Sequence, residues 1–367
     1  MALNQVGLER LGTSVTDKIG ENKNLVINGA MQVAQRGTSF TSVTATAYHL
    51  DRFQYNLNGT VGAATVTQNT VTDLAGFTKS LKVDCTTADA SLAASDRLTL
   101  RYAFEGQDLQ QVAKGTSSAK QLTLSFYIKA TKTGTQIVEL FDHDNTRHCA
   151  KSVTISQSNT WEKKTITYPA DTTGALDNDN ANSISIFFGI ACGTDFTSGT
   201  LATAWAANTN ANRFVGQVNH FDNTANNFEI TGVQLEVGSV ATDFEFISFG
   251  DELLRCQRYF YKIIGTSDDM AAIGFAQSSS DNYFNMEFPV PMRDYPTLSG
   301  SATPARFFSS NNGQDFNLNA MSLSSNMTNA NPKRVMLYVN QAGTAGGLGG
   351  ALHFQDQEGF LEFSAEL

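Results

Sequence analysis

The sequence predicts an all-β protein: a jelly-roll β-sandwich followed by a short helical linker and a second, smaller β-sandwich domain. Many short segments alternate apolar and polar residues, and turn-forming Gly, Asn, Asp or Ser residues separate them. The chain has 367 residues, 41% of them hydrophobic, and single cores stop growing beyond about 250 to 300 residues. We therefore expect an N-terminal arm at 1–24, the jelly roll at 25–247, the linker at 248–264 and the C-terminal β-domain at 265–367.

The strand signals of the first domain form a regular series. Each shows period-two alternation or a run of β-branched residues, as a half-buried strand does. Thr194 to Asn212 breaks the series with small polar residues and is predicted to be a long surface loop. The predicted strands cover 49–57, 63–71, 79–85, 96–104, 120–130, 136–142, 148–156, 162–169, 183–191 and 226–238.

In the last of these strands, "GVQLEVG", alternate residues have different environments. Val233, Leu235 and Val237 are expected to face the core, and Gln234 and Glu236 to face outward or to pair at a sheet edge. The alternation predicts a strand with one buried face.

A helical signal separates the two series of strands. The segment "FGDELLRCQRYFYK" opens with a capping region and continues with strong helix formers, which predicts a helix between Phe249 and Lys262. Strand signals then resume and define the smaller second β-domain. They cover 270–277, 281–292, 303–310, 333–340, 350–356 and 359–367.

The charge pattern argues against a nucleic-acid binder. The formal net charge is -10, and no dense basic run is present to replace the counterions around phosphate. No apolar stretch approaches the roughly 20 residues that cross a bilayer, and the N-terminus lacks the apolar core of a signal peptide. The four cysteines are far apart and are expected to be buried and unpaired. We expect a soluble chain with no membrane insertion.

Two acidic segments are the best candidates for chemistry. Glu139 to Cys149 combines acids with His143 and His148, as a metal or acid–base site would, but a polar hairpin turn is the simpler interpretation. Asp171 to Asn182 suggests calcium, yet it lacks the EF-hand spacing, and a solvated loop is again simpler. No nucleophile elbow, phosphate loop or zinc motif is present. We therefore predict no catalytic residue, no metal, no cofactor and no enzymatic activity.

Glycan binding by a β-sandwich needs exposed aromatic rings for the sugar faces, with amide or carboxylate groups nearby. Trp205 in the long loop, with Asn208 and Asn210 close by, is the best ligand-binding candidate. The alternative is that Trp205 fills a gap beneath its loop or an interchain contact. Trp161 begins a strand and is predicted to lie in the core.

Several segments resemble those that recur in bacteriophage and prophage tail-fibre or minor tail proteins. They are "KNLVINGAMQVAQRGTSFT", "YHLDRFQY", "FEITGVQLEVGSVATDFEFISFGDELLRCQRYFYK", "FPVPMR" and a terminal "FSAEL". The resemblance covers most of the chain from Asn24 to Leu367. It implies a jelly roll similar to carbohydrate-binding modules, a second β-domain and a role in the virion, generally as a homotrimer.

The function that this resemblance implies is that of a tail-fibre or tail-associated fibre subunit on the phage particle exterior. It would be made in the host cytoplasm, contact other virion proteins through its arm and attach to a host glycan or protein without catalysis. The alternatives are a head fibre or decoration protein, a free carbohydrate-binding module, and a glycan depolymerase with paired carboxylates. Assembly contacts are expected from the arm and the helix, through Leu8, Leu11, Val15, Ile19, Arg255, Arg258, Tyr259 and Tyr261.

Overall fold

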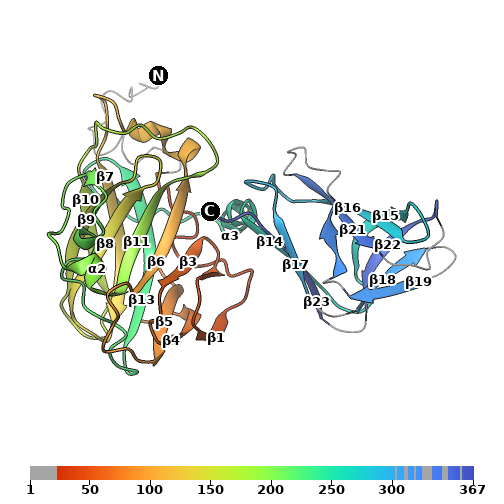
Figure 1. Ribbon diagram of the computed structural model, residues 1–367, viewed down its shortest axis with the longest axis horizontal. Coiled ribbons are helices and arrows are strands. Elements are labelled where there is room, and N and C mark those ends of the chain that lie inside the picture. Colours follow the sequence, from red (N-terminus) through yellow and green to blue (C-terminus); the bar gives the residue numbers. More distant parts are fainter. Residues whose placement is uncertain are drawn as a thin grey trace, which may run out of the picture. The chain divides into compact units, whose positions relative to one another are not determined.

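Alternation along the strands produces stacked sheets with a core between them. The chain divides into two units, Met1–Ile247 (unit 1) and Ser248–Leu367 (unit 2) (Figure 1). The fold is all-β: unit 1 is a jelly-roll β-sandwich, and unit 2 begins with a short helix and continues as a smaller β-domain. The computed structural model describes residues 23–301, 304–309, 313–317, 320–324, 333–340, 346–355 and 358–367.

Unit 1 contains one six-stranded and one seven-stranded antiparallel sheet. The six-stranded sheet has the order β1 (Ser39–Val43), β4 (Ala63–Thr70), β5 (Lys79–Thr87), β13 (Asn227–Val237), β7 (Leu122–Ala130) and β10 (Glu162–Tyr168). The seven-stranded sheet has the order β12 (Ala206–Ala207), β9 (Arg147–Ile155), β8 (Gly134–Asp142), β11 (Asn182–Cys192), β6 (Arg97–Glu105), β3 (Phe53–Asn58) and β2 (Ala47–Leu50). Short helical segments in this unit are η2 (Gly106–Val112), α2 (Thr194–Thr197) and η3 (Asn210–Asn212).

The core of unit 1 lies between the two sheets. Leu124, Phe126 and Ile128, alternate residues of β7, are fully buried, and so are Ile186 and Phe188 on β11 of the other sheet. The rings of Phe126 and Phe188 meet edge to face, with their centroids 5.1 Å apart. The outward residues of each sheet are therefore the ones left for other contacts.

The last segment of unit 1 covers part of the outer face of the six-stranded sheet. Val233 and Leu235 on β13 lie in the core, as the alternation predicts, and Gln234 points to the opposite face. Gln234 is nevertheless buried, because its Oε1 accepts a hydrogen bond of 2.8 Å from the backbone N–H of Glu245. The segment "GVQLEVGSVATDFEF" is thus a strand followed by a return across its own sheet.

The segment that precedes β1 contacts β13 at a position, Gly29, where only glycine fits. The Asn24 side chain donates to the carbonyl of Val233 (3.2 Å) and accepts from the N–H of Leu235 (3.1 Å). The N–H of Val233 in turn donates to the carbonyl of Gly29 at 2.9 Å. A Cβ on Gly29 would lie 2.1 Å from the Val233 carbonyl oxygen. The segment "KNLVINGAMQ" therefore ties the start of the sandwich to its last strand.

We expect Gly29→Ala to destabilise unit 1 by about 1 to 3 kcal/mol, because the added methyl group forces this tie away from β13. Tryptophan fluorescence reports on unit 1 alone, since both tryptophans, Trp161 and Trp205, lie in it. The control is Gly250→Ala in unit 2, where no atom lies within 4 Å of the added Cβ. It should leave the fluorescence transition in denaturant unchanged. An unchanged transition for Gly29→Ala as well would refute the close contact.

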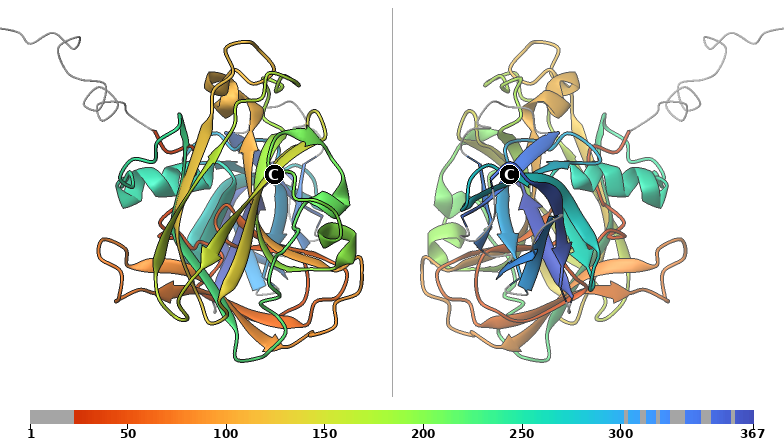
Figure 2. Two further views of the ribbon diagram at one scale, coloured as in Figure 1. Left: turned by 90° about the vertical axis from the view of Figure 1, so that its left-hand side faces the viewer. Right: turned by 90° about the vertical axis from the view of Figure 1, so that its right-hand side faces the viewer.

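The outer face of the seven-stranded sheet is only partly covered. The segment after β11 carries α2 and returns along the outer side of this sheet (Figure 2). Its Phe196 and Phe214 pack on Ile137 of β8, Ala150 of β9 and Phe187 of β11. On β3 and β6 the outward side chains of Gln54, Asn56, Arg97 and Arg101 stay partly exposed. This part of the sheet is therefore open to solvent.

Unit 2 begins with α3 (Phe249–Gln257), so the predicted helix is present but ends before Lys262. Ser248 is its N-cap, and its Oγ accepts a hydrogen bond of 3.3 Å from the N–H of Asp251. Strand β14 (Phe260–Gly265) follows, because its residues pair with β23 (Gly359–Ser364) instead of continuing the helix. No helix in the described ranges is long and apolar enough to cross a bilayer.

Two sheets make up the rest of unit 2. Phe284 and Phe307 are buried in its core, with their ring centroids 5.3 Å apart. The three-stranded sheet has the order β14, β23 and β17 (Thr297–Gly300). The seven-stranded sheet has the order β19 (Gly313–Asn317), β18 (Pro304–Ser309), β22 (Gly349–Phe354), β15 (Met270–Ala276), β16 (Asp281–Glu287), β21 (Arg334–Asn340) and β20 (Ser322–Leu323).

Three details of the sequence predictions for unit 1 need correction. The single strand expected at 49–57 is two strands, β2 and β3, because the chain turns at Arg52, whose φ is 72°. The surface loop expected from Thr194 to Asn212 contains α2, β12 and η3, and Phe196 anchors it on the sheet. Cys192 is half-buried, whereas the other three cysteines are buried as expected, and all four are free.

Candidate functional site

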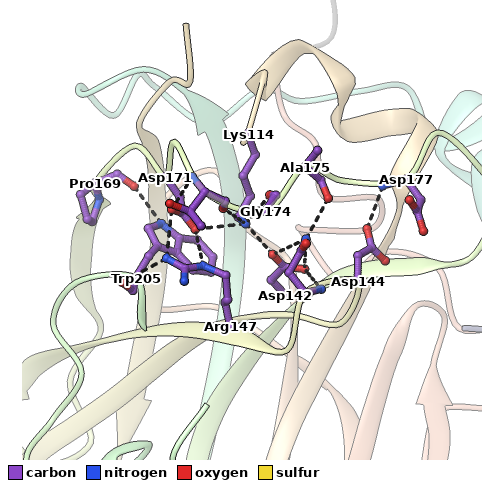
Figure 3. Close-up of polar contacts among 12 residues, drawn as sticks. Lys114, Asp142, Asp144, Arg147, Pro169, Asp171, Gly174, Ala175, Asp177 and Trp205 are labelled. Carbon is purple, nitrogen blue, oxygen red and sulfur yellow. Dashed lines mark hydrogen bonds and ion pairs between the residues drawn. The ribbon is translucent and has the colours of Figure 1, made fainter. Parts of the chain in front are cut away.

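The two acidic segments that stand out in the sequence meet around one lysine (Figure 3). Lys114 follows η2, and its Nζ lies 2.5 Å from Asp142 Oδ2 and 3.1 Å from Asp171 Oδ2. It also donates to the carbonyl oxygens of Thr173 (3.2 Å) and Gly174 (2.9 Å). All three charged side chains are buried. The ammonium group therefore joins the β8–β9 turn to the loop after β10.

Asp171 has a second cationic partner. Arg147 donates to it from Nε at 2.9 Å and from Nη2 at 3.1 Å, in a bidentate geometry. Burial by itself would raise the pKa of Asp171, but the hydrogen bonds from Arg147 and Lys114 lower it below its ordinary value. Asp171 is thus ionised at neutral pH and is unsuited to act as a general acid.

The cluster has the chemistry of a structural ion network. Asp142 accepts a further hydrogen bond of 3.0 Å from the N–H of Asn145, as an Asp at the start of a turn does. Asp144 accepts from the N–H of Asp177 at 2.9 Å, away from the lysine. In the part of the chain that the structure describes, no group of three or more His, Cys, Asp or Glu side chains is placed to hold a metal ion.

Trp205, the predicted sugar-stacking residue, borders this cluster. Its indole N–H donates to the Pro169 carbonyl at 2.9 Å, and Lys114 Nζ lies 5.0 Å from the ring centroid (Figure 3). The ring is half-buried and packs against the core. Asn208 donates to Asn210 Oδ1 at 3.3 Å. These contacts favour a gap-filling role for Trp205, and sugar binding by the three residues stays a prediction.

The prediction that Trp161 lies in the core is wrong. Its indole N–H donates to Asp73 Oδ1 at 2.9 Å, and Lys129 Nζ lies 5.5 Å from a ring centroid of the same side chain. Trp161 is half-buried. It directly precedes β10, so the alternation of that strand does not direct its side chain into the sandwich.

A second polar cluster, which the sequence analysis missed, lies on the outer face of the seven-stranded sheet. Cross-strand pairing aligns Gln54 on β3, Arg101 on β6, Phe187 on β11 and Glu139 on β8 in one row. These side chains point outward, because their neighbours along each strand are buried between the sheets. We call this surface the arginine face. Its exposed or half-buried members are Gln54, Asn56, Arg97, Arg101, Phe141 and His143.

A buried ion network supports the arginine face from one side. Arg213, from the segment after η3, donates to Glu139 from Nε at 2.8 and 3.0 Å and from Nη2 at 2.6 Å. His148 Nδ1 lies 2.8 Å from Glu139 Oε1. Burial by itself would raise the pKa of Glu139, but Arg213 and His148 lower it. Glu139 is therefore ionised at neutral pH.

Arg97 and Arg213 both contact Phe187. The Arg97 guanidinium carbon lies 5.8 Å from the ring centroid of Phe187 and 5.0 Å from that of Phe196. The Arg213 guanidinium carbon lies 5.4 Å from Phe187. Burial, and after it the charge of Arg213, lowers the pKa of Arg97. These cation–π contacts hold the Arg97 guanidinium in place.

Amide and hydroxyl groups connect Arg97 to Arg101. Arg97 Nη2 lies 3.5 Å from Asn56 Oδ1, and Asn56 Nδ2 donates to Gln54 Oε1 at 3.1 Å. Arg101 Nη1 donates to the same Gln54 oxygen at 3.3 Å, and its Nε donates to Ser185 Oγ at 3.1 Å. This chain of contacts orients both guanidinium groups on the surface.

An aromatic ring and an imidazole complete the arginine face. His143 Nε2 lies 3.0 Å from Ser185 Oγ, and its ring packs on Phe141 with centroids 4.8 Å apart. Arg213 also lies over Phe141, at 4.8 Å from the ring centroid. Polar side chains and an aromatic ring on one face can bind a polar ligand through hydrogen bonds and ring packing.

The structure describes four of the predicted assembly residues. Tyr259 is only 1% exposed, which argues against a contact with another copy, and its assembly role stays a prediction. Tyr261 is half-buried and packs on Phe363 of the same unit, because it belongs to β14 and not to the helix. Arg255 and Arg258 are half-buried, and their assembly role stays a prediction. The four arm residues, Leu8, Leu11, Val15 and Ile19, lie outside the described residues.

Fold and site together define a class: a two-unit, all-β protein whose jelly roll carries a cationic and aromatic sheet face. No protein-family profile matches the chain, and no curated protein sequence matches it. Among solved structures, the enzymatically active domain of tailspike protein 4 from bacteriophage CBA120 matches at 14% identity and a TM-score of 0.30. That match covers 59% of this chain and 21% of the tailspike chain, so this protein spans about a fifth of its length.

Two carbohydrate-binding-module structures are also similar in fold. The C-terminal family 22 module of Clostridium thermocellum Xyn10B has 13% identity and a TM-score of 0.30, over 61% of this chain and 99% of that one. The tandem family 22 modules of Paenibacillus barcinonensis Xyn10C have 9% identity and a TM-score of 0.29, over 94% of this chain and 98% of that one. At such values the function has to be argued from the residues of this chain.

Proposed function

We propose that this protein binds saccharides through the arginine face and does so without catalysis. The observation that carries the proposal is the group of outward side chains Gln54, Asn56, Arg97 and Arg101, with Phe141 on the same face of the sheet, two strands from β6. Amide and guanidinium groups form directional hydrogen bonds with hydroxyl groups, and an aromatic ring packs against sugar C–H groups. The bonds among these side chains fix them before a ligand arrives, which lowers the entropic cost of binding.

The absence of catalysis is proposed from the condition of the nearby acids. Glycoside hydrolysis uses two carboxyl groups, one as the acid and the other as the nucleophile or base. Glu139 is bound by Arg213 and His148, and Asp142 and Asp171 are bound by Lys114. None of these three carboxylates is available for either role.

Binding to a panel of immobilised bacterial surface polysaccharides tests the proposal. We expect at least one polysaccharide to bind, and Gln54→Ala with Asn56→Ala to weaken it by about tenfold or more. Lys82→Ala is the matched control, since Lys82 lies on β5 of the other sheet and pairs with Asp84 at 2.8 Å. Its affinity should equal that of the wild type.

Two results would contradict this proposal. If no polysaccharide binds, or if the double variant binds as tightly as the wild type, the arginine face is not a saccharide site. Release of reducing sugars from a bound polysaccharide by the purified protein would show that it is an enzyme.

We further propose that the saccharide lies on a host surface and that the protein is a fibre subunit of a phage particle. The segments similar to tail-fibre and minor tail proteins support this setting. In it, the protein is a homotrimer on the particle exterior, and residues 1–24 contact other virion proteins. Light scattering of the purified protein should give the mass of a trimer. Deletion of 1–24 should abolish incorporation of the protein into virions. A monomer would instead favour a free carbohydrate-binding module.

A further inference from the structure

We propose that the saccharide bound by the arginine face is acidic, with its carboxylate held by Arg97 and with Arg101 adding a second positive charge. This inference rests on the proposed function, because it names the ligand class of the same site. It is carried by the balance of charge on this face and by the hydrogen bonds that Arg97 does not make.

Positive charge gathers on this face of an acidic protein. The chain has a formal net charge of -10, yet Arg97, Arg101 and Arg213 meet on the outer face of one sheet. Positive charges that lie close together on one surface repel one another. The lowered pKa of Arg97 follows first from burial and then from the charge of Arg213, so the two groups do interact. A bound anion would relieve this repulsion.

Glu139, the carboxylate on the arginine face, already has cationic partners. Glu139 accepts three hydrogen bonds from Arg213, and its Oε1 also contacts His148. A carboxylate has about four lone-pair sites, so these contacts fill it. Glu139 therefore pairs with Arg213 and His148 and forms no ion pair with Arg97.

Arg97 has no acidic partner among the residues that the structure describes. Its Nη2 lies 3.5 Å from Asn56 Oδ1, at the limit of a hydrogen bond, and its Nε is buried without a hydrogen-bond partner. A buried donor that lacks an acceptor is unfavourable, above all on a charged group. A carboxylate on the ligand would give the Arg97 guanidinium an anionic partner.

The placement of Arg97 suits a carboxylate in particular. Phe187 and Phe196 hold the guanidinium by cation–π contacts, and its N–H groups form a planar fork that matches the two oxygens of a carboxylate. Asn56 pairs opposite Thr99, between Arg97 and Arg101 along β6. Amide groups next to the fork can bind the hydroxyl groups of the sugar ring that carries the acid.

A purely structural role is the alternative explanation for Arg97. By contacting Phe196 it could serve only to hold the α2 segment on the sheet. In that case the acidity of the ligand would not matter, and the effect of replacing Arg97 would be the same for acidic and neutral saccharides. Comparing the effect of replacing Arg97 on acidic and on neutral saccharides therefore separates the two roles.

The test uses the same polysaccharide panel with each uronic-acid-containing member in two forms, native and carboxyl-reduced. We expect the native form to bind at least about tenfold more tightly than the reduced form, and its affinity to fall as sodium chloride is raised from 50 to 500 mM. Sulfated and phosphorylated polysaccharides form a third arm. Equal binding of native and reduced forms, or binding in the third arm alone, would overturn the acidic carboxylate inference and leave saccharide binding intact. No binding in any arm would overturn the proposed function itself.

Variants locate the carboxylate on the surface. Arg97→Gln should weaken binding of the native form about tenfold or more and leave that of the reduced form unchanged, and Arg97→Lys should fall between Arg97→Gln and the wild type. Lys82→Gln on the other sheet is the charge-matched control. If Arg97→Gln does not fold, Arg101→Gln gives the same comparison. A variant that keeps the preference of the wild type for the native form would overturn the assignment.

Discussion

Replacing Lys114 with Met is expected to lower the free energy of unfolding of unit 1 by about 3 to 5 kcal/mol. Methionine keeps most of the apolar stem but removes the ammonium group that joins Asp142 and Asp171. Asp171 retains Arg147 as a cationic partner, whereas Asp142 retains the neutral donors of Asn145. A buried carboxylate without a counterion is costly. Denaturant titration followed by tryptophan fluorescence measures the loss.

Two further variants define the cause of this loss. Lys82→Met breaks a pair at the surface of unit 1 and should change the free energy of unfolding by about 0.5 kcal/mol or less. Adding Asp142→Asn to Lys114→Met should recover part of the stability, because it removes the unpaired charge. Wild-type stability of Lys114→Met would mean that the network contributes nothing to folding. No recovery in the double variant would mean that Asp142 is not the source of the cost.

The strands could be predicted from sequence because their signal is local. Leu124, Phe126 and Ile128 alternate with polar residues on β7, and that alternation alone identifies the buried face. The failures occur where local preference is not decisive. Nothing in the residue type of Arg52 signals its positive φ, which splits β2 from β3. Tyr261 follows a helical pattern, yet pairing with β23, about a hundred residues later, makes it part of a strand.

The charged cluster could be predicted only in part, because its parts are far apart in the sequence. Asp142 and Asp171 stand out as acids in two loops, and acids without a visible cation suggest a metal. Lys114 lies 28 residues before Asp142 and is unremarkable as a loop lysine. It becomes the partner of both acids only when η2, the β8–β9 turn and the loop after β10 converge. A structural network and a metal site therefore look alike in the sequence.

The arginine face had a local signal that was not sufficient. In "RLTLRYAF", Arg97 and Arg101 alternate with Leu98 and Leu100, which places both arginines on the outer face of β6. Outward arginines on a strand usually belong to a solvated surface. What distinguishes this one is the return of the segment after α2, which brings Arg213 to the same face from more than a hundred residues away.

Acidification from pH 7.5 to pH 5 is expected to lower the free energy of unfolding of unit 1 by at least about 4 kcal/mol, mainly through two buried histidines. Burial, and after it the charge of Arg36, lowers the pKa of His49 to about 4. Burial, and after it the charge of Lys132, lowers that of His220 to about 4. In both rings Nδ1 is buried without a hydrogen-bond partner, so a proton added there would find no acceptor. Burial also lowers the pKa of His143 to about 4, but this side chain is exposed on the arginine face, so solvent reduces its contribution.

The direction follows from which state binds the proton first. The unfolded chain protonates each histidine below about pH 6.5, whereas the folded protein does so only near pH 4. Stability is therefore fully present above pH 6.5 and is lost as the pH falls toward 4. Each histidine contributes about 2 kcal/mol to the loss at pH 5. Carboxylates with lowered pKa values, such as Glu139, titrate at lower pH in both states and add little in this range.

Glutamine at both positions isolates the contribution of the histidines. Because glutamine does not titrate, His49→Gln with His220→Gln should lose less than about 2 kcal/mol between pH 7.5 and pH 5, whatever its stability at pH 7.5, and His143 contributes to this remaining loss. The comparison is the difference between two denaturant titrations of the same variant, followed by tryptophan fluorescence. His353→Gln in unit 2 serves as the control and should keep the pH dependence of the wild type for unit 1. A double variant that is as sensitive to acid as the wild type would show that other groups carry the effect.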